Sequence, residues 1–82
     1  MYEISYRKNN LGGYTELSYK RLFKKLIDLD MQHNELMEKA NVSRSTFYKL
    51  KNGENVTTDI LLRICDALDC DISEIMECIK ND

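Results

Sequence analysis

Apolar side chains recur at intervals of three and four residues over most of the sequence, which is the spacing of one face of an α-helix. Leu22, Phe23, Leu26 and Ile27 form one such stripe. Short polar segments rich in Asn, Asp, Ser or Gly separate the stripes, and these residue types commonly begin and end helices. The pattern therefore predicts an all-α domain of five helices.

The predicted helices run from about residue 18 to 29, from 32 or 33 to 40, from 44 to 51, from 57 or 58 with a last apolar position at 68, and from 71 with a last apolar position at 79. Ser18 and Ser43 stand where the first and third helices need an N-cap. Asp59 falls in the first turn of the fourth helix, where the helix dipole favours an acid. The apolar positions of the fifth helix are Ile72, Ile75, Met76 and Ile79.

Residues 1–17 follow a different pattern, in which apolar and polar residues alternate. The alternating apolar residues near the start are Tyr2, Ile4 and Tyr6. Alternation returns at 15–19, and the intervening segment 9–13 is typical of a turn. We expect an N-terminal arm over 1–17, either a short β-hairpin or a mobile segment, before a domain over 18–82. A strand in this arm could also pair with its counterpart in a second copy of the chain.

Two short helical patterns separated by a three-residue break lie within residues 32–53. Leu36 and Ala40 share one face of the first, and Phe47 and Leu50 share one face of the second. An Asn-Gly pair ends the second pattern. This layout is a helix-turn-helix whose second helix directs a polar, partly basic face outward. Such a face is suited to enter the major groove of DNA.

This segment resembles the lambda-repressor-like family of DNA-binding domains (Cro/CI, XRE-type). The positions that agree with the family pattern are Leu36, Val42, Ser43, Phe47, Leu50, Asn52 and Gly53. The departures are His33 in place of Gln, Met37 in place of Ala, Asn41 in place of Gly and Lys51 in place of Glu. Asn tolerates a left-handed backbone, so the turn is still expected to form. The resemblance extends over residues 18–79 and implies a five-helix DNA-binding fold.

The candidate DNA-binding residues are His33, Ser43, Arg44, Ser45, Thr46, Tyr48, Lys49 and Asn52. The planar guanidinium of Arg44 can bond guanine or phosphate, and the short Ser45 hydroxyl can do the same. By resemblance, Arg44, Ser45 and Lys49 fall on base-contact positions, whereas His33 and Asn52 fall on positions that contact the DNA backbone.

Five of these assignments have an alternative that involves no DNA. Arg44 and Lys49 could be ordinary solvated charges. Tyr48 could pack against a neighbouring helix, and His33 could cap the second helix. The Thr46 methyl group could face either the core or a thymine.

Charge is divided unevenly along the chain, although the net charge is only −2. Residues 19–53 carry eight Lys and Arg against four acids, whereas residues 54–82 carry two against eight. The mean charge therefore hides a basic segment that coincides with the helix-turn-helix.

Composition gives little reason to expect an enzyme, a metal or a cofactor. Cys65, Cys70 and Cys78 are not spaced as metal ligands, and the only His, His33, is far from them. We expect these cysteines to be packing residues or free thiols. No apolar run is long enough for a membrane span or a signal peptide, so a cytoplasmic protein is expected.

Two functions follow as hypotheses. The first is a transcriptional regulator that binds a double-stranded DNA operator as a homodimer. The second is a protein-binding adaptor or antitoxin-like module that docks its acidic C-terminal half, residues 54–82, on a partner. Neither hypothesis requires a cofactor.

Overall fold

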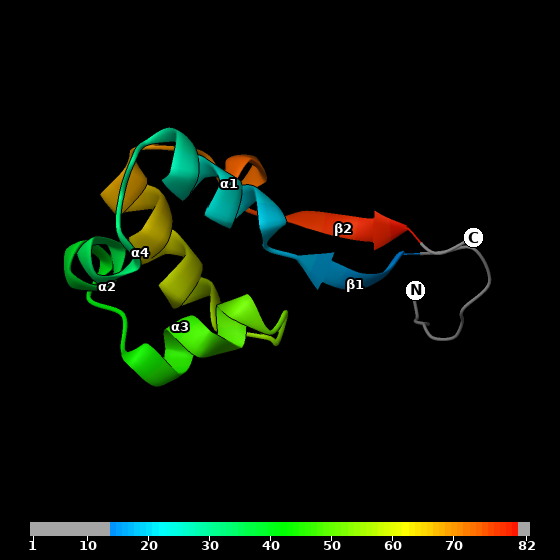
Figure 1. The fold of residues 1–82 in the computed structure, drawn as a ribbon. Coiled ribbons are helices and arrows are strands. Elements are labelled where there is room, and N and C mark those ends of the chain that lie inside the picture. Colours follow the sequence, from blue (N-terminus) through cyan, green and yellow to red (C-terminus); the bar gives the residue numbers. More distant parts are fainter. Residues whose placement is uncertain (1–13, 81–82) are drawn as a thin grey trace.

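The computed structural model describes residues 14–80 (Figure 1). The elements are β1 Tyr14–Ser18, α1 Lys20–Asp28, α2 His33–Ala40, α3 Arg44–Lys51, α4 Thr58–Leu68, the 3₁₀-helix η2 Ile72–Glu74 and β2 Glu77–Lys80. The first four predicted helices are confirmed, with closely similar bounds. The predictions made for Tyr2, Ile4 and Tyr6 and for the turn at 9–13 lie outside the described residues.

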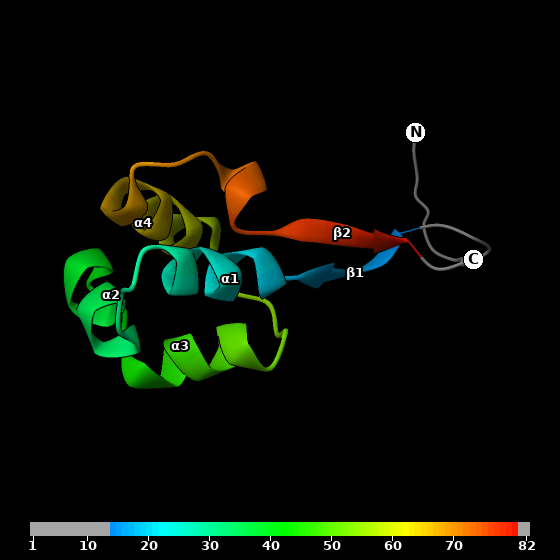
Figure 2. The same ribbon diagram turned by 45° about the horizontal axis from the view of Figure 1, so that its top comes forward.

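The four α-helices enclose one hydrophobic core, and the two strands form a ribbon that projects from it (Figures 1 and 2). The buried apolar residues are Tyr19, Leu22, Leu26, Leu36, Ala40, Val42, Phe47, Leu50, Leu61, Ile64, Leu68 and Ile75. Most of them belong to the predicted stripes. In both views α3 lies at the periphery of the helical body. None of the helices within residues 14–80 is both long and apolar enough to cross a membrane.

Each of the four α-helices is followed by a residue with a left-handed backbone. These residues are Asp30, Asn41, Gly53 and Asp69, with φ of 55°, 55°, 73° and 52°. The N–H of the next residue bonds back to the last helical turn, as Val42 does to the Met37 carbonyl at 2.9 Å. This bond satisfies a carbonyl that a helix end leaves without a partner. The predicted left-handed turn at Asn41 and helix stop at Gly53 are both confirmed.

Asp69→Gly is expected to raise the free energy of unfolding by about 0.5–1 kcal/mol, as measured by urea denaturation. Glycine adopts a positive φ without strain, and its introduction removes a carboxylate from the negative end of the α4 dipole. Asp69→Ala is the matched control, because it removes the same charge but keeps a Cβ atom. The control should be less stable than Asp69→Gly. A lower urea midpoint for Asp69→Gly than for the parent would show that this position holds no strain.

The helix starts are capped as predicted at Ser43 but not at Ser18. The Ser43 hydroxyl accepts the N–H of Thr46 at 3.2 Å. The N-cap of α1 is Tyr19, which makes no side-chain cap, while Ser18 ends β1. The Ser18 hydroxyl accepts the N–H of Lys20 at 3.3 Å. The prediction for Ser18 is wrong because strand pairing continues through this residue and delays the helix.

The mostly helical fold is confirmed, but the predicted fifth helix over residues 71–79 is wrong, and the described residues contain two strands that an all-α fold lacks. The chain there forms only the short η2 and then β2, which pairs antiparallel with β1. Ile75 is fully buried, but Ile72 is 44% exposed and Met76 and Ile79 are only partly buried. Pairing of β1 with β2 satisfies backbone N–H and C=O groups of both strands. The helical spacing of the apolar residues in 71–79 does not indicate this pairing.

The ribbon joins segments that are distant in sequence, because Leu17 pairs with Cys78 and Ser18 with Glu77. The strand that alternation predicts near residues 15–19 is therefore confirmed, and its partner lies within the same chain. The boundary expected after residue 17 falls inside β1.

Two cations of α1 hold the C-terminal elements in place. Arg21 donates to the Ser73 carbonyl at 2.8 Å and to the Glu77 carboxylate at 3.2 Å. Lys25 donates to Glu74 at 3.0 Å. A backbone N–H and the Lys25 ammonium both bond the Glu74 carboxylate and hold its pKa below the ordinary value. The contribution to stability is therefore present at neutral pH and is lost as the pH falls through that lowered pKa.

Candidate nucleic-acid interface

The turn between α2 and α3, residues 41–43, is fixed by contacts with the core and with α4. The Val42 side chain is only 6% exposed. The Arg63 guanidinium on α4 donates to the Asn41 carbonyl at 3.0 Å and pairs with the Asp59 carboxylate at 2.8 Å. The sequence shows the helical spacing of Asp59 and Arg63 but gives no sign of the contact with Asn41, so the sequence analysis missed this role. Together these contacts set the direction in which α3 leaves the turn.

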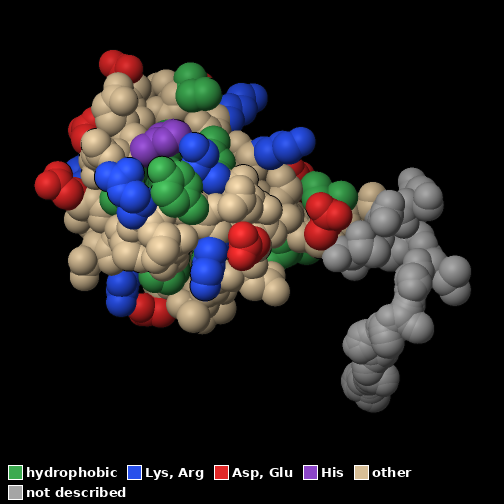
Figure 3. Space-filling model, turned by 60° about the horizontal axis from the view of Figure 1, so that its bottom comes forward, with side chains coloured by type: hydrophobic (Ala, Val, Ile, Leu, Met, Phe, Trp, Pro, Cys, Tyr) green, Lys and Arg blue, Asp and Glu red, His purple; other side chains and the backbone are tan. Residues whose placement is uncertain are grey.

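The α3 helix has one buried side and one exposed side. Phe47 and Leu50 are 2% and 1% exposed, which confirms that they belong to the core. Arg44, Ser45 and Lys49 are exposed, and none of the ion pairs found in the described residues involves them. Figure 3 views the molecule from the side on which α3 lies, where Lys and Arg side chains gather around the histidine.

Hydroxyl groups form a small network at the start of α3. The Ser43 hydroxyl donates to the Thr46 hydroxyl at 3.0 Å and lies 3.2 Å from the Ser45 hydroxyl. Thr46 is half-buried and therefore turned partly away from solvent. The Ser43 side chain is occupied as a helix cap, so its backbone is better placed than its hydroxyl to meet a ligand.

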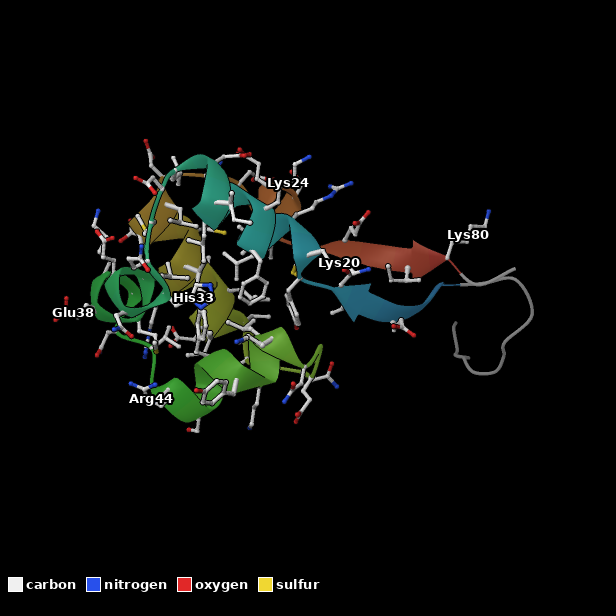
Figure 4. All side chains as sticks on the ribbon, in the orientation of Figure 1. Lys20, Lys24, His33, Glu38, Arg44 and Lys80 are labelled. Carbon is white, nitrogen blue, oxygen red and sulfur yellow. The ribbon has the colours of Figure 1, made fainter. Side chains whose placement is uncertain are left out.

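His33 is the first residue of α2 and joins a cluster of three aromatic rings. Its ring centroid lies 5.7 Å from that of Phe23 and 5.0 Å from that of Phe47. Gln32 occupies the N-cap position, and its N–H bonds the Glu35 carboxylate at 3.0 Å. The alternative in which His33 caps α2 is therefore wrong. The residue as a whole is exposed and extends the aromatic core to the surface (Figure 4).

Tyr48 and Asn52 lie farther along α3. The Tyr48 side chain is 47% exposed, and the Lys51 ammonium lies 5.6 Å from its ring centroid. A large part of the ring is thus free to meet a ligand. Asn52 is the C-cap residue of α3, and its amide lies 3.5 Å from the Glu54 carboxylate.

The three cysteines are free thiols. Cys65 and Cys70 are half-buried, and burial raises the pKa of both thiols. A raised pKa lowers the fraction of reactive thiolate at neutral pH. Within residues 14–80, no group of three or more potential metal ligands comes together.

The comparison with known proteins agrees with this geometry. The family model described as Cro/C1-type HTH DNA-binding domain matches residues 21–81. The crystal structure of transcriptional regulator VanUg, Form II, superposes with a TM-score of 0.78 at 44% sequence identity, covering 92% of this chain and 100% of that chain. None of the curated proteins matches the sequence. The chain therefore belongs to the Cro/C1-type helix-turn-helix family of DNA-binding domains.

Proposed function

We propose that the protein is a sequence-specific transcriptional regulator that reads the DNA major groove with α3. The proposal rests on the difference between the buried side and the exposed side of α3. Phe47 and Leu50 anchor one side in the core, while the other side carries exposed Arg44 and Lys49 without an ion pair among the described residues. A helix fixed in this way presents donors to base edges with little freedom to lose on binding.

Arg44, Ser45 and Lys49 are the proposed base-reading residues. Arg44 begins the helix, where its fork can bond the O6 and N7 atoms of guanine. Ser45 follows at the same end, and Lys49 and Tyr48 lie one turn later over the groove. Thr46 has a smaller proposed part, because it is half-buried and bonded to the helix cap.

His33, Ser43 and Asn52 are the proposed contacts to the DNA backbone. His33 and Ser43 lie at the starts of α2 and α3, where free backbone N–H groups and the helix dipole favour phosphate. Asn52 lies at the opposite end of α3. Contacts at both ends of α3 would fix its register on the duplex.

We further propose that the protein acts as a homodimer on a two-fold operator. A single small domain makes few phosphate contacts, and two half-sites are the common route to high affinity. A dimer surface on a fifth helix around Met76 and Ile79 is excluded, because that segment contains η2 and β2. The ribbon is one candidate surface, since each strand of the two-stranded sheet has one edge without a strand partner among residues 14–80.

Sedimentation of the intact chain is expected to show a dimer, alone or with operator DNA. Cys78→Arg places a charge on the exposed side of β2, and it should shift the protein toward monomer if the ribbon is the interface. Leu62→Arg is the control, because Leu62 is 68% exposed on α4. A monomer at high protein concentration that also binds DNA as a monomer would exclude the dimer.

The alternative function is a protein-binding adaptor or antitoxin-like module that uses the acidic C-terminal half. Three of its acids, Asp59, Glu74 and Glu77, already form ion pairs within the domain. Less free charge is therefore left for a basic partner, and DNA binding is the better supported function.

Selection of bound duplexes from a random DNA pool tests the proposed function. The expected result is an enriched motif with two-fold symmetry and half-sites about one helical turn apart. Binding of all duplexes alike, or of none, would exclude a sequence-specific regulator. The selected operator then serves as the probe for the variants described below.

A further inference from the structure

The four cations of α1 form two pairs with different surroundings. Arg21 and Lys25 contact the acids of η2 and β2, as described above. Lys20 and Lys24 are exposed and form no ion pair within the described part of the chain. At adjacent positions of α1, one cation thus forms an ion pair with a C-terminal acid and the other forms none among the described residues.

Lys20 lies beside the C-terminal end of α3. A surface groove of about 360 Å³ separates the start of α1 from the end of α3, and its lining includes Lys20, Lys51, Asn52 and Gly53. Lys24 lies one helical turn beyond Lys20 on the outward side of α1 (Figure 4). Lys20 therefore continues the basic surface of α3 onto a helix outside the helix-turn-helix, whereas Lys24 also lines a shallow groove with Arg21, Lys25 and Glu74.

We propose that Lys20 and Lys24 form a second contact with the DNA backbone, binding phosphates beside the groove that α3 enters. This inference rests on the proposed function and assigns part of the interface to α1. A free, exposed ammonium that approaches a phosphate releases a condensed counterion, which favours binding. Arg21 and Lys25 gain less from DNA, because contact would require them to leave carboxylates that they already neutralise.

Salt dependence of operator binding distinguishes a phosphate contact from a distant charge. The logarithm of the binding constant falls with the logarithm of salt concentration, with a slope of about −0.9 for each phosphate neutralised. Lys20→Gln and Lys24→Gln should each make the slope shallower by about 0.9, and the double variant should make it shallower by about 1.8. The selected base motif should not change, because phosphate contacts carry no direct sequence information.

The neighbouring residues supply charge-matched controls. Arg21→Gln is compared with Lys20→Gln, and Lys25→Gln with Lys24→Gln, since each removes one positive charge from an adjacent position of α1. The controls should lower the thermal midpoint and leave the salt slope close to that of the parent. Circular dichroism confirms that each variant is folded at the temperature of the binding measurement. Lys25→Gln retains both Arg21 contacts, so it supplies a folded control if Arg21→Gln unfolds.

The outcomes separate this inference from the proposed function. Absence of any selected operator for the parent would overturn the function itself. Sequence-specific binding by the parent, with equal slopes for Lys20→Gln and Arg21→Gln and for Lys24→Gln and Lys25→Gln, would overturn only the α1 contact. A shallower slope for one lysine alone would exclude the other from the contact.

Discussion

Phe47→Ala is expected to lower the free energy of unfolding by about 3–5 kcal/mol, which approaches the whole stability of a small domain. Phe47 is 2% exposed, and its ring centroid lies 5.6 Å from that of Phe23 and 5.0 Å from that of His33. Truncation leaves a cavity where α1, α2 and α3 meet. Urea denaturation followed by circular dichroism measures the loss.

Tyr48→Ala is the control for this variant, because Tyr48 is the next residue along α3 and its side chain is 47% exposed. It should change stability far less than Phe47→Ala and act mainly on DNA binding. Equal melting of Phe47→Ala and the parent would mean that α3 is rotated differently about its axis. The proposed base contacts would then be wrong as well.

Arg44→Ala is expected to weaken operator binding by about 1–3 kcal/mol, which is roughly a 5- to 150-fold loss of affinity. Arg44 is exposed at the first position of α3 and forms none of the ion pairs found in residues 14–80. If it reads a base, random-pool selection with the variant should relax one position in each half-site. Stability should hardly change, because the side chain contributes little to the core.

Arg44→Lys separates base reading from simple charge. Lysine keeps the positive charge but lacks the planar fork that bonds two acceptors of one guanine. Lost specificity with retained non-specific affinity indicates a base contact. Parent-like behaviour of Arg44→Lys indicates a phosphate contact, and parent-like behaviour of Arg44→Ala removes this residue from the interface.

Helices α2 and α3 follow from local sequence, because each has its own apolar stripe, its own N-cap and a left-handed residue after its last turn. Ser43 as a cap, Asn41 as a left-handed residue and Gly53 as a helix end all depend on neighbours within a few positions. The inward position of Phe47 follows in the same way from its spacing to Leu50. These features position α3, which explains why the sequence could predict its exposed face.

The features that the sequence did not predict depend on distant partners. The segment 71–79 has helical spacing, yet β1 offers a strand partner that no local pattern reports. The same pairing displaced the helix start from Ser18. Arg63 is another example, because its contact with Asn41 spans 22 positions.

The ribbon also has a consequence for the order in which the domain assembles during synthesis. Helices α1 to α4 are joined by turns of a few residues, whereas the partner that β1 has among residues 14–80, β2, is the last of the described elements to be synthesised. Arg21 and Glu77, which join α1 to β2, are 56 positions apart. The helices between these residues bring the two strands together, so β1 and β2 are expected to pair after those helices are ordered. Helix α3 can thus pack on the core while β1 is still unpaired with β2 and open to other strands.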